Sequence, residues 1–327
     1  MRRTFGWIAA ALLVVLAAWK LYESISPRAE QQKPLLFVPK TVDGRSDFWR
    51  VLGMGVQTAA KEFGVQVQTV GTVAETDVDG QIALLERAIE ERPRAIVLAA
   101  SDYNRVVPVA KRIQAAGIPL ITVDAGLNGG IAASFVATDN YEAGRKAGEA
   151  ALRLLPQDAT IAVVSFVKGT ATSMERERGV RERLAEAPGV NVLEETYFSD
   201  GSIDKAYRIV SRLLRERPDI QGFVCLNEPT TTGAAKALQE SGRAGEVKLV
   251  GFDSSTDEID YLEADVIQAI VVQNPFNMGY LAVRAAVDAA RGKRTEPVID
   301  TGSEVITKQN LYNKENQKLL FPFDDPD

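Results

Sequence analysis

Residues 91–124 have the sequence ERPRAIVLAASDYNRVVPVAKRIQAAGIPLITVD. The stretch contains an apolar run at 95–99, an amphipathic segment at 105–116, and a second apolar run at 120–123 that ends on Asp124. The apolar residues of both runs are consecutive instead of alternating, which is typical of a strand with helices on both faces of its sheet. The stretch therefore predicts a β–α–β unit of a parallel sheet.

The same alternation continues on both sides of this unit. Consecutive apolar residues predict further strands at 35–39, 65–71, 134–137, 161–166, 190–197, 222–226, 249–252 and 268–272. Helical spacing of apolar residues predicts helices at 47–63, 77–91 and 140–155. Because about ten strands strain one twisted sheet, two open sheets fit better than one. The sequence therefore predicts an α/β fold with two parallel sheets, each covered by helices on both faces.

An internal repeat supports the division into two sheets. Residues 216–253 repeat the order found at 91–124: Glu-Arg-Pro, an apolar run, a helical segment and a second apolar run that ends on an aspartate. In open α/β sheets, ligands bind beyond the carboxyl ends of the strands. Two facing lobes would therefore direct Asp124 and Asp253 into a shared cleft. Each aspartate, taken alone, could instead cap the helix that follows it.

The composition limits the possible functions. The chain of 327 residues has a formal net charge of −6, so it offers no bulk excess of basic residues for a nucleic-acid partner. It contains no histidine, which excludes His-ligated metals and histidine-based acid–base catalysis. Its single cysteine, Cys225, leaves no partner for an intramolecular disulfide.

No motif points to catalysis. Residues 53–55, Gly-Met-Gly, resemble the start of a dinucleotide-binding motif, but they fall inside the predicted helix 47–63, where small residues favour helix packing. The sequence has neither a phosphate-binding loop G-x-x-x-x-G-K-[ST] nor a nucleophile elbow G-x-S-x-G. We therefore expect a protein that is not an enzyme and that uses no cofactor and no metal ion.

The N-terminal residues predict export from the cytoplasm. Arg2 and Arg3 precede an apolar run that extends over residues 5–22 if Lys20 reaches to the lipid headgroups, and this length just suffices to span a bilayer. We expect residues 1–34 to be an uncleaved membrane anchor followed by a short polar stalk. The alternative is a secretory signal that is removed, although Pro27 is a poor context for a signal peptidase.

Polar and aromatic side chains follow several predicted strands. They are Lys40, Ser46, Asp47, Phe48 and Trp49 after the first strand, Asp124 after the fourth, Asn227, Asp253 and Gln273 after later strands, and Arg176 and Arg178 at the start of a helix. A sugar has vicinal hydroxyls, which carboxylate, amide and guanidinium groups bind in pairs, and an apolar face against which aromatic rings pack. The set therefore predicts a sugar site. Alternatively, either arginine could lie on a solvated helix face and either aromatic residue in the core.

From residue 35 onward, the chain resembles the ribose- and galactose-type periplasmic sugar-binding proteins, which are the type I solute-binding proteins of sugar ABC transporters. The motifs that carry the resemblance are Asp-Phe-Trp at 47–49, Ile-Thr-Val-Asp at 121–124, Ala-Thr-Asp-Asn at 137–140, Arg-Glu-Arg-Gly at 176–179, Gly-Phe-Asp at 251–253 and Gln-Asn-Pro at 273–275.

The resemblance implies two Rossmann-like lobes joined by a three-strand hinge that crosses near Thr138, Asn274 and Thr301. Lobe one would consist of 35–137 and 274–301, and lobe two of 138–273 and 302–327. The resemblance also implies a set of ligand contacts: stacking by Phe48 and Trp49, and hydrogen bonds from Asp124, Arg178, Asn227, Asp253 and Gln273.

Two positions depart from the ribose-type pattern. Ala125 stands where that pattern has an arginine, so strict ribose specificity is not expected. Lys40 replaces a small polar residue, and an autoinducer-sugar receptor of the same fold also has a lysine there; we include Lys40 among the ligand contacts. The lactose-repressor family shares the fold but begins with a helix-turn-helix, whereas this chain begins with an apolar segment.

Two functions remain after this comparison. In the first, the protein binds a monosaccharide outside the cytoplasm and delivers it to an ABC permease. In the second, it stays tethered to the membrane and reports the sugar to a membrane histidine kinase. The expected location is the cell surface for an anchored protein, or the periplasm if the N-terminal segment is cleaved.

Overall fold

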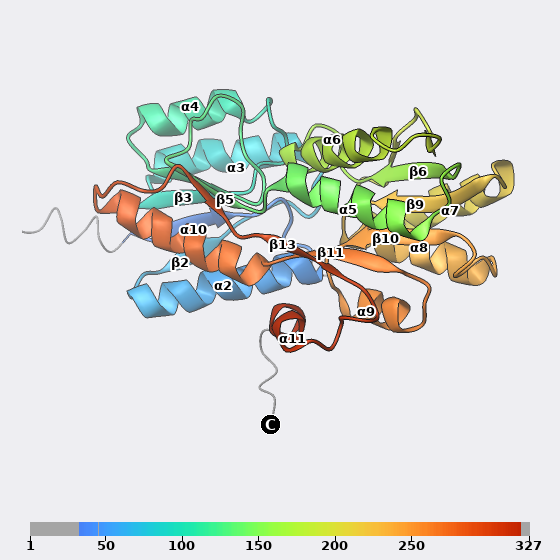
Figure 1. Cartoon of the computed structure of the whole chain (residues 1–327). Helices are drawn as coiled ribbons and strands as arrows, with labels where there is room; N and C mark the ends of the chain where they lie inside the picture. Colours follow the sequence, from blue (N-terminus) through green and yellow to red (C-terminus); the bar gives the residue numbers. More distant parts are fainter. Residues whose placement is uncertain (1–32, 45, 322–327) are drawn as a thin grey trace, which may run out of the picture.

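The computed structural model describes residues 33–44 and 46–321 and contains two open β-sheets lying end to end (Figure 1). The first sheet has the strand order β12-β5-β4-β3-β1-β2, and all of its strands are parallel. Its strands are β1 (Leu35–Val38), β2 (Val67–Thr69), β3 (Ala95–Leu98), β4 (Leu120–Val123), β5 (Ser134–Ala137) and β12 (Val298–Asp300).

The second sheet has the order β13-β11-β10-β9-β6-β7, and β8 also pairs with β6. Its strands are β6 (Thr160–Ser165), β7 (Asn191–Val192), β8 (Tyr197–Phe198), β9 (Ile220–Cys225), β10 (Lys248–Phe252), β11 (Ala269–Gln273) and β13 (Ser303–Ile306). Within the described part of the chain, β13 is the single antiparallel member, paired with β11. The strand predicted at 190–197 is two short strands, β7 and β8, and neither β12 nor β13 was predicted.

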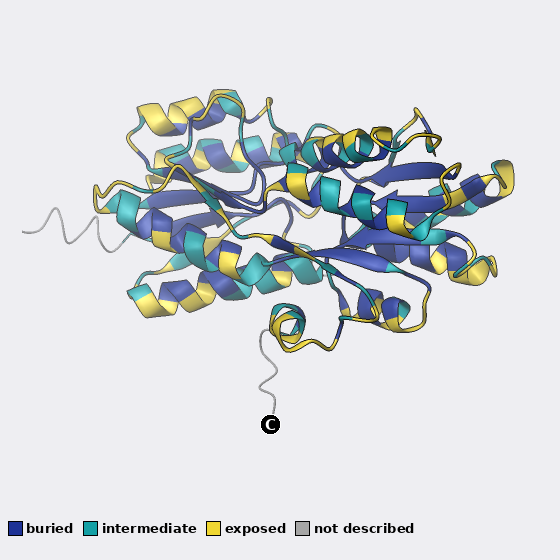
Figure 2. Cartoon of the chain, viewed as in Figure 1, coloured by how far each residue is buried: buried dark blue, intermediate teal, exposed yellow. Residues whose placement is uncertain are grey.

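Helices cover both faces of each sheet, which confirms the predicted fold class. The first sheet carries α2 (Asp47–Phe63) and α10 (Pro275–Ala290) on one face and α3 (Val78–Glu91) and α4 (Val107–Ala115) on the other. The second sheet carries α5 (Asn140–Leu154), α6 (Ala171–Ala185), α7 (Ile203–Glu216), α8 (Glu228–Glu240), α9 (Thr256–Glu263) and α11 (Lys314–Leu320). The central strands β1, β3, β4, β6, β9, β10 and β11 are buried except at Gln221 in β9 and Lys248 in β10 (Figure 2), as consecutive apolar residues require. We call each sheet with its helices a lobe.

Two glycines allow α2 and α10 to pack closely. A Cβ atom on Gly55 would lie 2.0 Å from the carbonyl oxygen of Phe276, and one on Gly279 would lie 2.1 Å from the carbonyl oxygen of Leu52. By contrast, a Cβ atom on Gly53 would have no heavy atom within 4 Å. Of the Gly-Met-Gly segment, Gly55 therefore has the packing role. The contact fixes α2, whose first turn faces the other lobe.

The chain passes between the two sheets three times: from β5 to α5, from β11 to α10, and from β12 to β13. The first and third crossings are joined by a hydrogen bond of 3.0 Å from the Thr138 hydroxyl to the carbonyl oxygen of Gly302. The lobe boundaries at 137/138, 273/274 and 301/302 stay a prediction. The expected anchor at 5–22 lies outside the described residues, and within 33–44 and 46–321 no helix is long and apolar enough to span a bilayer.

Candidate functional site: a cavity between the lobes

A small cavity of about 40 Å³ lies between the carboxyl ends of the strands of the two sheets. It is lined by Lys40, Ser46, Phe48, Trp49, Glu75, Asp124, Phe166, Thr172, Arg176, Asn227, Glu228, Pro229, Asp253 and Gln273. Of the residues in the predicted sugar site, only Asp47 and Arg178 are not among them. The structure therefore brings these side chains together, while their role as ligand contacts stays a prediction.

The two strand-end aspartates occupy equivalent positions in the two lobes. Both have left-handed backbone conformations, with φ of 59° at Asp124 and 76° at Asp253. The N–H of Asp124 donates to the carbonyl oxygen of Val136 (3.0 Å), and that of Asp253 donates to the carbonyl oxygen of Val271 (2.9 Å). Neither aspartate is a helix N-cap, because β4 leads into β5 and Ser255 caps α9. Positive φ at residues other than glycine is costly and is often found at functional sites.

Asp253 is held by hydrogen bonds to both carboxylate oxygens. The Gln273 amide nitrogen donates to Oδ1 (2.6 Å), and the backbone N–H of Glu228 donates to Oδ2 (3.0 Å). Burial raises the pKa of Asp253, while the nearby Arg176 guanidinium acts in the opposite direction. The buried Gln273 Oε1 has no hydrogen-bond partner among the described residues, so it is an acceptor available to a ligand hydroxyl.

Lys40 joins the two lobes through its ammonium group. Its Nζ lies 2.7 Å from Asp124 Oδ2 in the first lobe and donates to Thr172 Oγ1 (3.1 Å) in the second. The same nitrogen lies 5.9 Å from the ring centroids of Trp49 and Phe166. Both partners of the ion pair are buried, so Lys40 is a fixed part of the cavity wall instead of a solvated surface lysine.

Phe48 and Trp49 supply aromatic surface from the first turn of α2. Their rings form an edge-to-face pair, with centroids 5.2 Å apart and an interplanar angle of 89°. Trp49 is buried and also packs in the apolar core of the first lobe, so the core role considered for it holds in part. Its indole N–H donates to Glu75 Oε1 (2.7 Å).

Of the two candidate arginines, the structure places Arg176 and not Arg178 at the cavity. The side chain of Arg178 is 51% exposed and lies over the ring of Tyr141, outside the cavity. Arg176 is buried, and it donates to Asn140 Oδ1 and to the carbonyl oxygen of Leu226, both at 2.8 Å. Residues two apart on a helix are about 200° apart around its axis, so only one of the two can face the cavity.

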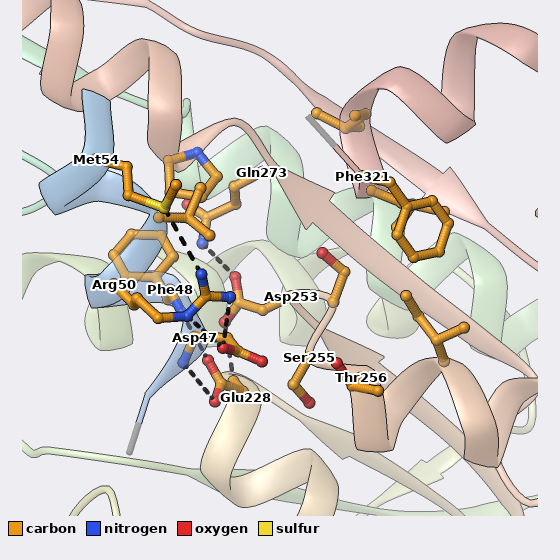
Figure 3. A pocket seen from close by; sticks show the side chains of 16 residues that line it. Asp47, Phe48, Arg50, Met54, Glu228, Asp253, Ser255, Thr256, Gln273 and Phe321 are labelled. Carbon is orange, nitrogen blue, oxygen red and sulfur yellow. Dashed lines mark hydrogen bonds and ion pairs between the residues drawn. The ribbon is translucent and has the colours of Figure 1, made fainter. Parts of the chain in front are cut away.

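Glu228, the first residue of α8, connects the second lobe to the N-terminus of α2 (Figure 3). Its carboxylate accepts hydrogen bonds from the Ser46 hydroxyl (3.1 Å), the Asp47 N–H (3.2 Å) and the Phe48 N–H (3.0 Å). The N–H groups of Asp47 and Phe48 belong to the first turn of α2, which leaves them without a partner inside the helix. Burial raises the pKa of Glu228 to about 7, and the neighbouring Asp253 adds to this effect. No sequence pattern predicted this contact between the lobes.

Asn227 caps α8 and also faces the cavity. Its Oδ1 accepts from the Thr230 N–H (3.2 Å), while its amide nitrogen makes no hydrogen bond within the part of the chain that the structure describes. The oxygen of Asn227 therefore caps the helix, while a ligand contact by its amide nitrogen stays a prediction.

Several cavity residues escaped the sequence analysis. Glu75, Phe166 and Thr172 follow β2 and β6, so a systematic search beyond the carboxyl end of every strand would have found them. A second cavity of about 320 Å³ is lined by residues of α2 and α9 and by residues 319–321 (Figure 3). It shares Phe48, Glu228, Asp253 and Gln273 with the first. Among the described residues, no cluster of three or more His, Cys, Asp or Glu could hold a metal ion.

Comparisons with known proteins identify the family. The model of the periplasmic binding protein domain matches residues 36–294. The chain is 28% identical over 260 residues to the D-allose-binding periplasmic protein of Escherichia coli, covering 77% of this chain and 83% of that protein. The chain therefore belongs to the periplasmic binding protein family, in its type I sugar-binding group.

Solved structures agree with this assignment. An ABC transporter solute-binding protein from Agrobacterium vitis with bound D-fucose superposes with a TM-score of 0.85 at 28% identity, over 88% of this chain and 100% of that one. A sugar transporter from Clostridium phytofermentans has a TM-score of 0.79 at 38% identity, over 85% of this chain and 100% of that one. The extracytoplasmic location that the sequence predicts is the location implied by this family.

Proposed function

We propose that this protein binds a monosaccharide outside the cytoplasm and delivers it to an ABC permease. The observation that carries the proposal is the cavity between the lobes, which pairs carboxylate, amide and guanidinium groups with aromatic rings. The relatives support it, because they are named as binding proteins for allose, ribose and other sugars.

Eight side chains of the cavity have a role in this proposal. Phe48 and Trp49 pack against the apolar face of the sugar. Asp124, Asp253 and Gln273 accept hydrogen bonds from its hydroxyls. Three nitrogen groups donate to the sugar oxygens: the Asn227 amide, the Lys40 ammonium and the Arg176 guanidinium.

Binding requires the lobes to separate. The cavity of about 40 Å³ is far smaller than sites for small molecules, which measure about 300–1,000 Å³. The structure therefore corresponds to a closed arrangement, in which Lys40 and Glu228 bridge the lobes. Hinge closure around the ligand is the motion known for periplasmic binding proteins, and the three crossings supply the hinge.

The test is calorimetric titration of the purified protein with a panel of pentoses and hexoses, combined with thermal melts with and without each sugar. We expect one or a few sugars to bind and to raise the melting temperature by mass action. Failure of every sugar to bind would contradict the proposal.

The second candidate function is a membrane-tethered sugar sensor that signals to a histidine kinase. It is favoured by the apolar run at 5–22, which is not followed by a cysteine that could carry a lipid anchor. Deletion of the gene separates the two functions. Loss of uptake of the labelled sugar supports delivery to a permease, whereas intact uptake with loss of the transcriptional response to the sugar supports sensing.

A further inference from the structure

Glu75 is a cavity residue without an assigned role. It lies in the loop between β2 and α3, and its Oε1 accepts the indole N–H of Trp49 at 2.7 Å. Its Oε2 makes no hydrogen bond within residues 33–44 and 46–321. A carboxylate with one oxygen fixed and the other free at the cavity is suited to receive a hydrogen bond from a ligand.

The loop that carries Glu75 is attached to the segment after β1. The Thr41 hydroxyl donates to the carbonyl oxygen of Val73 (2.6 Å), and the Val42 N–H donates to the carbonyl oxygen of Thr72 (2.9 Å). The bond from Trp49 then sets the orientation of the Glu75 side chain itself. Because both loop and side chain are held in place, the free oxygen needs little ordering when a ligand binds.

The cations near Glu75 already lie beside carboxylates of the cavity. The Lys40 ammonium is already paired with Asp124 at 2.7 Å. The Arg176 guanidinium interacts electrostatically with Asp253, Asp124 and Glu75. Glu75 itself lies in this crowded field, and burial raises its pKa although Lys40 and the Trp49 indole act in the opposite direction.

We propose that Glu75 is a specificity residue, which binds a sugar hydroxyl through its free oxygen and excludes sugars that carry a carboxylate or a phosphate. This inference rests on the proposed function and adds the selection against acidic sugars. The cavity has more carboxyl groups, on Glu75, Asp124, Asp253 and Glu228, than cations, on Lys40 and Arg176. An acidic sugar would add a further negative charge, and like charges close together in a buried site are strongly unfavourable.

The test compares wild type with Glu75→Gln, using the sugar that binds best and its uronic acid. The amide retains an oxygen for the Trp49 indole but replaces the second acceptor by a donor and removes the charge. We expect the variant to bind the neutral sugar about 10- to 100-fold more weakly, because it lacks one hydrogen bond to a charged acceptor. In wild type, we expect the neutral sugar to bind at least about 100-fold more tightly than its uronic acid. In Glu75→Gln, this ratio should fall at least about tenfold.

The matched control is Glu90→Gln, which makes the same substitution at an exposed position of α3 in the same lobe. It should leave both affinities unchanged. Melting temperatures without ligand show whether Glu75→Gln is folded. The difference in tryptophan fluorescence from wild type shows whether the Trp49 indole contact is intact, because Trp7 and Trp19 are common to both proteins. A shortened side chain in Glu75→Asp provides a second variant, which should keep the discrimination against the uronic acid but lose affinity for the neutral sugar.

Two outcomes would overturn the inference while leaving sugar binding established. One is unchanged affinity of folded Glu75→Gln for the neutral sugar, and the other is comparable affinity of wild type for the sugar and its uronic acid. If wild type binds no sugar of either kind, the proposed function itself fails.

Discussion

Replacing Arg176 by alanine is expected to weaken both sugar binding and the fold. The guanidinium donates to Asn140 and Leu226 within its own lobe, and its third nitrogen has no hydrogen-bond partner among the described residues and is free to donate to a ligand. Loss of one hydrogen bond between a charged donor and the sugar costs about 2–3 kcal/mol, which corresponds to roughly 30- to 150-fold in affinity. The free energy of unfolding should fall by about 3–5 kcal/mol, because Asp253 loses the buried cation that compensates its charge.

The contrast with Arg178 makes this prediction specific. Arg178→Ala removes an exposed side chain on the same helix and should leave the affinity within about twofold of wild type. Arg176→Lys keeps the charge but loses the planar, branched donor, so it should recover most of the stability and little of the affinity. Calorimetric titration and urea unfolding measure the two effects separately. Normal binding by Arg176→Ala, or loss of binding by Arg178→Ala, would refute the placement of Arg176 in the site.

Three further predictions concern packing, pH and the N-terminus. Gly55→Ala should lower the free energy of unfolding by about 1–3 kcal/mol in urea, because its Cβ atom would overlap α10. Gly53→Ala should be neutral or stabilising by up to about 1 kcal/mol. Equal effects of the two substitutions would contradict the close contact between α2 and α10. The pKa of Glu228 is raised from 4.5 to about 7, so the folded state favours the protonated form of this carboxyl. Its contribution to the free energy of unfolding, on the order of 3 kcal/mol, is therefore complete below about pH 4.5 and is lost as the pH rises through about 7. Glu228→Gln should therefore reduce the fall in melting temperature between pH 5 and pH 8, and an unchanged pH profile would argue against this assignment. If residues 5–22 anchor the protein uncleaved, it should remain with the membrane fraction after a high-salt wash; a soluble form beginning at 27–31 would show that the segment is removed.

The buried strands were predictable because their consecutive apolar residues have one physical explanation, a sheet covered on both faces. β12 and β13 lack that signal. β12 is a three-residue edge strand whose side chains are mostly exposed, and in β13 only the first and last residues are buried. Both strands are defined by pairing with distant segments, at β5 and β11, and such pairing leaves no local trace in the sequence.

The candidate site was predictable where a strand end fixed the position of a side chain. Asp124, Asp253 and Gln273 were found in this way. The choice between Arg176 and Arg178 was not, since α6 carries charged residues around most of its circumference and its apolar pattern does not define an inward face. The packing of α6 against α5 decides which arginine is buried, and that contact is tertiary.

The three crossings between the lobes also bear on the order in which the protein is completed during synthesis. β5 ends at Ala137, but the helix that covers its sheet beside α2 begins only at Pro275, and the edge strand β12 follows at Val298. A chain emerging from its N-terminus therefore exposes an apolar face of the first sheet while nearly all of the second lobe is made. Exposed apolar surface and unpaired strand edges promote aggregation. For an exported chain, this order favours crossing the membrane unfolded and folding afterwards, when α10 and β12 are both present.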